Sequence, residues 1–366
     1  MPNLSARKEK IVNTPRIITI ETGVPAHHYR QPEILDYFLG FQGESRRERA
    51  MRAVFERAGV GFRHMVVERD YFDQPRSTQA RNDLYMAEAV PLGQAVICAG
   101  LDSSGFSPAV IDDLIVVSCT GFSIPGLDLQ LAGLLGMRPD LHRACILGMG
   151  CYGSFPGIRR ASEAVKANPG SLALMLSLEL CSLHMQFDSS SENVVSTALF
   201  SDGAAMALIG DDAAASRVPG TLAPRIMDAR THCDYSTLDH MSFKVTDSGF
   251  RMYLSSYVPD LLAAQVGSFV DSLLTANGLR REDVRYWGIH PGSTKIVDLV
   301  QAQLGLSDEQ VEPSHNVLYN YGNMSSATIL FVLDHIQRCN HPEPDEYGVL
   351  LAFGPGLTME GMLLRW

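Results

Sequence analysis

Apolar and polar positions follow a characteristic order around residues 143–167. An apolar run at 144–147 predicts a buried strand, and the glycines at positions 148 and 150 predict a tight turn after it. Polar side chains then recur at helical spacing, which predicts a helix up to residue 167. Cys151 lies at this corner between strand and helix. Because a helix N-terminus carries partial positive charge, we expect an unusually acidic thiol, with a buried, inert cysteine as the alternative.

The same periodicity predicts elements elsewhere. Apolar runs at residues 16–21, 113–118 and 286–289 predict strands, and helical spacing predicts helices within residues 32–58 and from 84 to 100. The first helical segment is rich in arginine, which indicates either a solvated face or a site that binds an anion such as phosphate. These arginines are Arg46, Arg47, Arg49, Arg52 and Arg57.

Sliding the sequence along itself reveals an internal repeat at an offset of about 170 residues. Each copy predicts strand, helix, strand, helix, strand, with right-handed crossovers and helices on both faces of a buried sheet. Two such copies predict a layered α/β/α/β/α fold with pseudo-twofold symmetry and halves at residues 1–220 and 221–366. The matching segments are 109–121 with 280–292, 127–137 with 296–306, 145–165 with 317–336, and 171–180 with 346–355.

The repeat also predicts which reactive side chains meet. Cys151 and Asn323 occupy near-equivalent corners of the two halves, and His290 follows the strand at 286–289. A pseudo-twofold axis would bring the three together in a cleft between the halves. Taken alone, His290 has the alternative of a structural histidine. Asn323 has the alternative of an N-cap for the helix predicted at 325–337.

Composition narrows the class of protein. The chain has 366 residues, 46% of them hydrophobic, which is enough for a large core. Its formal net charge of −11 disfavours nucleic acid as a partner. The seven cysteines lack the paired spacing of zinc sites, which predicts a reducing compartment and no metal site. The polar start has no signal-peptide pattern and no apolar run reaches about eighteen residues, so we expect a cytoplasmic protein without a membrane span.

Cysteine, histidine and asparagine together suit one type of reaction. A thiolate paired with an imidazolium can take an acyl group from a thioester. N–H donors from histidine and asparagine can then hold the enolate that forms when a malonyl thioester loses carbon dioxide. These steps make up a decarboxylative Claisen condensation. A cysteine protease uses the same residue types, but the repeated α/β halves are unlike a papain-type chain.

Five motifs carry a resemblance to a known family over nearly the whole chain. They are GCYGSFPG around Cys151, ALFSDGAA at 198–205, GIHPGS at 288–293, YGNMSSAT at 321–328 and FGPGLTMEGMLLRW at 353–366. Together they resemble the type III polyketide synthases, or chalcone-synthase-like enzymes, which implies a thiolase-like fold. β-Ketoacyl synthase III shares the Cys-His-Asn set but typically has FGGG-like residues near the C-terminus. Thiolases usually carry a second cysteine in that loop, where this chain has none.

The resemblance implies roles for single residues. Cys151 is expected to carry the acyl chain, His290 to act as its base and as an oxyanion donor, and Asn323 to be the second donor. Phe200 is expected to keep the malonyl carboxylate in an apolar setting and so favour decarboxylation. Ile124 matches the residue that family dimers insert into the neighbouring subunit's cavity, which implies a homodimer.

Two positions depart from the plant enzymes of the family. Met252 stands where they have an aromatic gatekeeper, and His184 stands where they have a small hydroxyl residue. The flexible side chain of Met252 at the mouth of the cavity and the ring of His184, which narrows the cavity, favour a long acyl starter that is extended few times. The expected contacts to coenzyme A are Arg52, Arg57 and Lys295.

The sequence therefore predicts an acyltransferase that makes polyketides. An acyl-coenzyme A starter is loaded on Cys151, extended by malonyl-coenzyme A in repeated condensations and cyclised, with an alkylpyrone or resorcinol as the expected product type. The coenzyme A thioesters are substrates, and no cofactor is expected. A single-condensation ketosynthase is the alternative. A catalytically silent scaffold is disfavoured because all three reactive residues are present.

Overall fold

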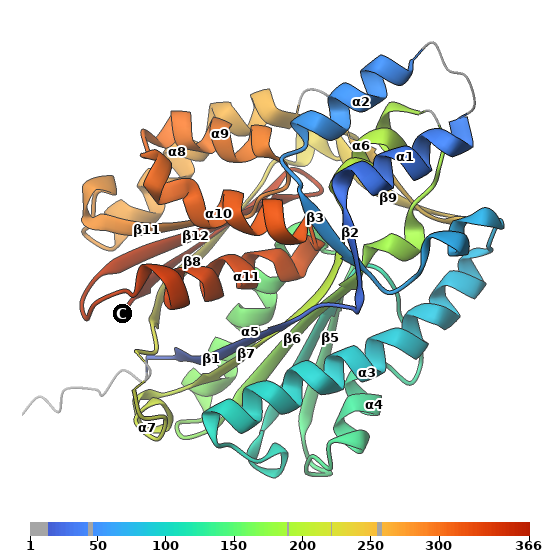
Figure 1. Ribbon diagram of the computed structural model, residues 1–366. Helices are drawn as coiled ribbons and strands as arrows, with labels where there is room; N and C mark the ends of the chain where they lie inside the picture. The colour runs from blue at the N-terminus through green and yellow to red at the C-terminus, as the bar shows by residue number, and fades with distance from the viewer. Residues whose placement is uncertain (1–13, 43–46, 189, 221, 255–257) are drawn as a thin grey trace, which may run out of the picture.

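A mixed nine-stranded sheet runs through the molecule (Figure 1), whose computed structural model describes residues 14–42, 47–188, 190–220, 222–254 and 258–366. The strand order is β11-β12-β13-β8-β1-β7-β6-β4-β5. Strands of the first half are β1 (Arg16–Gly23), β4 (Asp113–Ser118), β5 (His142–Leu147), β6 (Ala173–Leu180) and β7 (Asp202–Gly210). Those of the second are β8 (Arg225–Cys233), β11 (Val284–Ile289), β12 (Tyr347–Gly354) and β13 (Thr358–Arg365).

The pairing within each half follows the predicted crossovers. β4 runs parallel to both β5 and β6, and β11 runs parallel to β12. The two halves join where β1 pairs with β8 through Arg16 and Arg225. The division expected at residue 220 falls in the loop between the short helix α7 (Asp212–Ala215) and β8.

Three separate hydrophobic cores define the layers. Helices α3 (Thr78–Ser104) and α4 (Leu127–Leu134) cover the outer face of the first half. Helices α8 (Val258–Ala276) and α9 (Thr294–Leu304) cover the outer face of the second. Between the halves, α5 (Ser154–Ala167) and α11 (Thr328–His335) share one core with strands of both, as Figure 1 shows. The predicted α/β/α/β/α order of layers is confirmed.

Two local predictions are wrong. β5 was expected to be buried, but it lies at the end of the sheet and most of its side chains are exposed. An apolar run alone does not distinguish a central strand from an edge strand. The match of 145–165 with 317–336 implies a strand at the start of the second segment, but residues 317–321 are the last part of helix α10 (Asp308–Tyr321). The repeat therefore matched a strand of the first half with the end of a helix in the second.

The remaining elements gather at one end of the molecule (Figure 1). Helices α1 (Gln31–Gln42) and α2 (Glu48–Arg57) confirm the helical prediction for 32–58 and pack near α6 (Ser191–Leu199). Two small antiparallel sheets complete this end: β2 (His27–Arg30) pairs with β3 (Phe62–Met65) across the intervening α1 and α2, and β9 (Met241–Thr246) forms a hairpin with β10 (Gly249–Leu254).

Helix α3 is longer than its sequence pattern predicted. Within the described parts of the chain, it is the one helix with the length and apolar composition of a membrane span. Its buried residues, including Tyr85, Ile97 and Leu101, pack against strands of the first half in a core that it shares with α4. This is the packing of a core helix in a globular domain.

Candidate active site

Cys151 lies in a short 3-10 turn, η3 (Gly150–Tyr152), between β5 and α5. Gly148 and Gly150 have φ angles of 73° and 69°, a region that strains residues with a Cβ. A Cβ at position 150 would also lie 2.9 Å from Cδ of Pro355. The two glycines therefore let the chain turn sharply and place Cys151 directly before helix α5, at the corner that the sequence predicts.

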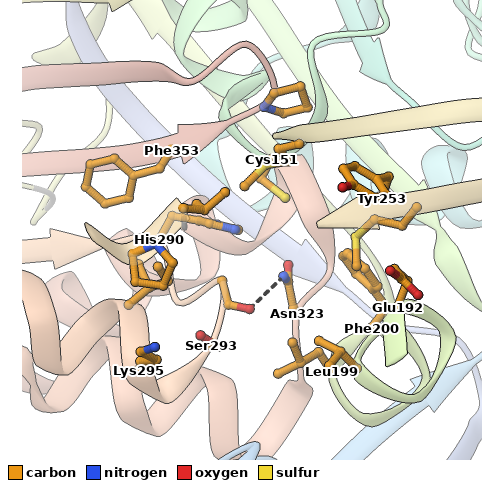
Figure 2. Close-up of a pocket in the computed structure, with 18 of the residues that line it drawn as sticks. Cys151, Glu192, Leu199, Phe200, Tyr253, His290, Ser293, Lys295, Asn323 and Phe353 are labelled. Carbon is orange, nitrogen blue, oxygen red and sulfur yellow. Dashed lines mark hydrogen bonds between the residues drawn. The ribbon is translucent and has the colours of Figure 1, made fainter. Parts of the chain in front are cut away.

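The structure brings the three expected catalytic side chains to one cavity. Cys151, His290 and Asn323 line a largely apolar cavity of about 640 Å³ (Figure 2). His290 comes from the end of β11, and Asn323 from the turn between α10 and α11. Phe200 and Met252 line the same cavity. Residues of both halves therefore form its wall.

The amide of Asn323 is held at both ends. Its Oδ1 accepts a hydrogen bond from the backbone N–H of Ser325 at 2.9 Å, which caps the turn before α11. Its Nδ2 donates to the carbonyl oxygen of Gly292 at 3.3 Å, shown as a dashed line in Figure 2. Gly292 itself lines the cavity. The Asn323 side chain can therefore cap the turn through Oδ1 and at the same time direct its Nδ2 donor toward the cavity wall.

Burial controls the protonation of Cys151 and His290. Neither ring nitrogen of the buried His290 has a hydrogen-bond partner among the described residues, and burial lowers the pKa of His290 to about 3. Cys151 is half-buried, yet the protein around its sulfur removes enough hydration to raise the thiol pKa to about 11, against the opposing hydrogen bonds from Ser325 and Asn323. The prediction of an acidic thiol is therefore wrong for Cys151 taken alone, because desolvation outweighs the helix N-terminus.

Moving the thiol proton to the imidazole changes this balance. The transfer creates an anion and a cation in the same cavity, and their attraction offsets part of the desolvation that opposes either charge alone. No hydrogen bond joins Cys151 to either ring nitrogen of His290 in this structure, so the ion pair is a hypothesis about the working enzyme.

Phe200 directly follows α6 and pairs with the backbone of Asn323. The two residues form an isolated parallel bridge. The N–H of Asn323 donates to the carbonyl of Leu199 at 2.9 Å, and the N–H of Ser201 donates to the carbonyl of Asn323 at 2.9 Å. This bridge fixes Phe200 next to Asn323 in the cavity wall.

His184 lies outside the main cavity, in the wall of a separate chamber of about 30 Å³. Its Nδ1 accepts the backbone N–H of Phe250 at 3.1 Å, so its Nε2 carries the proton that is donated to the carbonyl of Thr120 at 2.7 Å. The ring stacks on Phe250 with centroids 4.2 Å apart, and burial lowers the pKa of His184 to about 4. Met252 and Phe200 line both spaces and lie between them.

Comparison with known proteins identifies the family. The family model described as "Chalcone and stilbene synthases, N-terminal domain" matches residues 5–213, and the model of the C-terminal domain matches residues 232–366. The chain belongs to the chalcone and stilbene synthase family. It is a type III polyketide synthase, and the predicted enzyme class, an acyltransferase that makes polyketides, is confirmed.

Individual relatives support the assignment along the whole chain. The synthase is 33% identical over 351 residues to 1,3,6,8-tetrahydroxynaphthalene synthase of Streptomyces peucetius subsp. caesius, covering 96% of this chain and 93% of the relative. It is 32% identical over 355 residues to the alpha-pyrone synthesis polyketide synthase-like Pks18 of Mycobacterium tuberculosis, covering 94% and 89%. The crystal structure of PKS-I from the brown alga Ectocarpus siliculosus superposes with a TM-score of 0.91 at 30% identity, covering 98% of this chain and 100% of that one. The thiolase-like fold is thereby confirmed.

The basic residues expected to contact coenzyme A take three different positions on the synthase. Lys295 is exposed and lines the main cavity. Arg57 lines an adjoining open groove of about 410 Å³, which shares Leu199 and Ser293 with the cavity. Arg52 forms an ion pair with Glu48 at 2.9 Å on α2. Arg46 lies outside the described residues.

Ile124 is not among the described residues that line the cavity. Its side chain is 95% exposed in the loop before α4. Phe122 in the same loop is 56% exposed, and Leu147 at the end of β5 is 50% exposed. The synthase therefore presents large apolar side chains on this side of its first half.

Sequence reasoning missed one wall of the cavity. Glu192, Val195 and Leu199 of α6 all line it, and their spacing of three and four residues places them on one helix face. That spacing directly before the ALFSDGAA motif could have predicted a helix face in the cavity wall. No cluster of three or more potential metal ligands occurs among the residues that the structure describes.

Proposed function

We propose that Cys151 is the acyl-carrying nucleophile of this synthase, with His290 as its base and His290 and Asn323 as donors to the enolate. The observation that carries the proposal is that these three side chains line one largely apolar cavity together with Phe200. Cysteine, imidazole and amide side chains supply the nucleophile, the base and the hydrogen-bond donors that a decarboxylative condensation needs.

Loading of the starter begins with transfer of the Cys151 proton to His290. The thiolate attacks the thioester carbonyl of an acyl-coenzyme A, a new C–S bond forms, and coenzyme A leaves with the proton from the imidazole. Since burial opposes an isolated charge on either residue, the ion pair should exist mainly while substrate is bound.

Extension uses the same cavity. Malonyl-coenzyme A loses carbon dioxide, and the electron pair of the broken C–C bond forms an enolate whose oxygen is held by N–H groups of His290 and Asn323. The apolar ring of Phe200 gives the malonyl carboxylate little hydration, which favours its loss as neutral carbon dioxide. The enolate carbon attacks the Cys151 thioester, a C–C bond forms, and the Cys151 thiolate is released. The lengthened chain is now a coenzyme A thioester; it is transferred back to the Cys151 thiolate with loss of coenzyme A for another round, or it cyclises.

The positions of the basic side chains suit an entry route for coenzyme A. Lys295 at the main cavity and Arg57 in the adjoining groove could bind its phosphates, and Arg52 lies five residues before Arg57 on α2. Acyl-coenzyme A and malonyl-coenzyme A are thus the proposed substrates. The chemistry needs no further cofactor or metal.

Two separate spaces favour a long starter and few extensions. Met252 is an adaptable side chain between the main cavity and the small chamber at His184. The small chamber leaves little room for a growing chain, whereas the main cavity can hold an alkyl tail. We therefore propose an alkylpyrone or a resorcinol as the product, and one relative carries alpha-pyrone synthesis in its name.

A second copy of the chain is the proposed partner. Ile124, Phe122 and Leu147 are exposed apolar residues, and Leu147 lies on the open edge strand β5, all of which a homodimer would cover. In line with the family resemblance of this position, we propose that Ile124 enters the cavity of the partner subunit. We further propose a cytoplasmic enzyme that acts without nucleic acid or a membrane, in line with its acidic net charge.

The decisive experiment incubates the protein with an acyl-coenzyme A panel and malonyl-coenzyme A. We expect release of coenzyme A and carbon dioxide, cyclised products and a mass increase on Cys151. Cys151→Ala should abolish all of these, whereas the control Cys98→Ala on α3 should not. Products with one malonyl unit throughout would instead support a single-condensation ketosynthase. A wild-type protein that releases neither coenzyme A nor carbon dioxide would overturn the proposal.

A further inference from the structure

Arg63 is a buried arginine without a carboxylate partner in the described chain. It belongs to β3 and is 0% exposed, and burial lowers the pKa of Arg63 to about 9, so the guanidinium stays charged at neutral pH. Because a buried charge opposes folding, packing alone does not explain an arginine here. Its four hydrogen bonds all end on uncharged oxygens, namely the backbone carbonyls of Thr197, Ala198 and Phe200 and the side chain of Gln31.

The guanidinium of Arg63 caps the end of helix α6. The last four carbonyls of a helix lack partners within it, and a positive charge there also interacts favourably with the helix dipole. Nη1 of Arg63 donates to the carbonyl of Thr197, and Nη2 donates to that of Ala198 at 2.8 Å. The next carbonyl, that of Leu199, accepts from the backbone N–H of Asn323 at 2.9 Å. Arg63 and Asn323 therefore share the capping of this helix.

Phe200, the first residue after α6, is held between the same two partners. Its carbonyl accepts from Nη1 of Arg63 at 3.2 Å, and its backbone forms the bridge with Asn323. Gln31 keeps the guanidinium in place, since its Oε1 accepts from Nη2 while its Nε2 donates to the carbonyl of Ala198 at 2.9 Å. Arg63 is absent from the described residues that line the main cavity, so its influence on the chemistry must pass through the end of α6.

We propose that Arg63 is a positioning residue for malonyl decarboxylation, because its guanidinium holds Phe200 against Asn323 in the cavity wall. Without the forked donor, the carbonyls at the end of α6 lose their partners and the ring of Phe200 can move away from the malonyl group. A misplacement of about 1 Å can lower a rate by about 10². Loading of Cys151 does not use this ring and should change much less. The inference rests on the roles proposed above for Phe200 and Asn323.

A purely structural cap is the competing explanation. Loss of such a cap would lower the amount of folded protein, and with it loading and decarboxylation to the same extent. The ratio of the two rates in one preparation therefore separates positioning from stability. Arg63→Met removes the charge but keeps an unbranched stem. Arg63→Lys keeps the charge but replaces the planar fork with a single ammonium group.

The experiment measures carbon dioxide release from malonyl-coenzyme A and acyl adducts on Cys151 in the same preparation. In Arg63→Met we expect the ratio of decarboxylation to loading to fall by about 10- to 100-fold, with Arg63→Lys between this variant and the wild type. The same substitution is then made in a Phe200→Ala background. There it should lower decarboxylation by less than about twofold, since the ring that Arg63 positions is already gone.

The control is Arg281→Met, which removes an arginine that donates to the carbonyls of Gly267 and Gln303 on α8 and α9, at 3.3 and 3.2 Å. It should lower the thermal midpoint and leave the ratio unchanged. A folded Arg63→Met with the wild-type ratio, or an equal loss with and without Phe200, would overturn the inference. If Arg63→Met does not fold, the same two criteria apply to Arg63→Lys. A wild type that neither loads Cys151 nor releases carbon dioxide would overturn the proposed function instead.

Discussion

Phe200 and Asn323 are fixed side by side by direct backbone pairing, although 122 positions separate them along the chain. The N–H of Asn323 donates to the carbonyl of Leu199, and the carbonyl of Asn323 accepts from Ser201. The apolar ring of Phe200 and the amide donor of Asn323 thus come from different halves of the fold, and the backbone bridge holds them directly opposite each other. A malonyl group in this cavity would meet both at once.

This relationship makes Asn323 testable as a donor. Asn323→Ala should lower the rate of malonyl-coenzyme A decarboxylation by about 10² to 10³, because one donor to the developing enolate is lost. Starter loading on Cys151 should change much less. The rate of carbon dioxide release measures the effect, and Asn316→Ala on α10 is a matched control. Wild-type decarboxylation in Asn323→Ala would leave Asn323 with its capping role alone.

The protonation of Cys151 should depend on His290. In His290→Ala the thiol loses its proton acceptor, while the burial that raises its pKa stays, so the iodoacetamide rate should reach its midpoint at a higher pH than in the wild type. In the wild type the imidazole can take the proton, so the thiolate should form at lower pH and the midpoint should be lower. Alkylation rates at Cys151 across a pH series give both midpoints. Identical midpoints in the two proteins would show that His290 does not act as the base for Cys151.

The small chamber should set the number of extensions. His184→Thr removes a ring from the chamber wall, and we expect products with one more malonyl unit and nearly normal loading of Cys151. His184→Gln is the control, because glutamine keeps a hydrogen-bond donor and an acceptor and is bulkier than threonine. Mass spectra of the products distinguish the two. An unchanged profile in His184→Thr would mean that this chamber does not limit chain length, and loss of loading would place His184 in the chemistry.

The exposed Ile124 should be needed for dimer formation. Ile124→Glu places a charge in the apolar region of the first half, so we expect a shift toward monomer and reduced polyketide formation. Light scattering coupled to size exclusion gives the mass of the particle. Leu222→Glu changes another exposed apolar residue, in the loop after residue 220, and should leave the mass unchanged. A wild type that elutes as a monomer would contradict the proposed dimer.

The sequence was most informative where one physical signal repeated. Helical periodicity and the offset of about 170 residues led to the layered fold and to the meeting of Cys151, His290 and Asn323. Prediction from the sequence failed where the structure of a segment depends on the segments that pack beside it. The apolar run of β5 could not show that the strand lies at an edge, and the match at 317–321 could not separate a strand from the end of α10.

The pKa values of buried groups and the directions of side chains could also not be predicted from the sequence. The dipole at the start of α5 favours a thiolate, but the desolvation that opposes it depends on atoms from several distant segments. The motif led to the prediction that His184 narrows the cavity beside Cys151, whereas the structure has its ring in the wall of the small chamber. Its hydrogen bonds to Thr120 and Phe250, which hold the ring in the small chamber, arise only when β10 packs against the first half.

The edge strand β5 has a consequence for how the protein is made in a cell. Beyond β5 the described chain offers no further strand to pair with it, so a row of backbone N–H and C=O groups stays open to other chains. Apolar side chains such as Leu147 lie along the same edge. Newly synthesised subunits would thus be prone to aggregate until this edge is covered. If a second copy covers this edge, as in the proposed homodimer, soluble yield should depend on how quickly two copies associate, even for variants whose individual folds are as stable as the wild type.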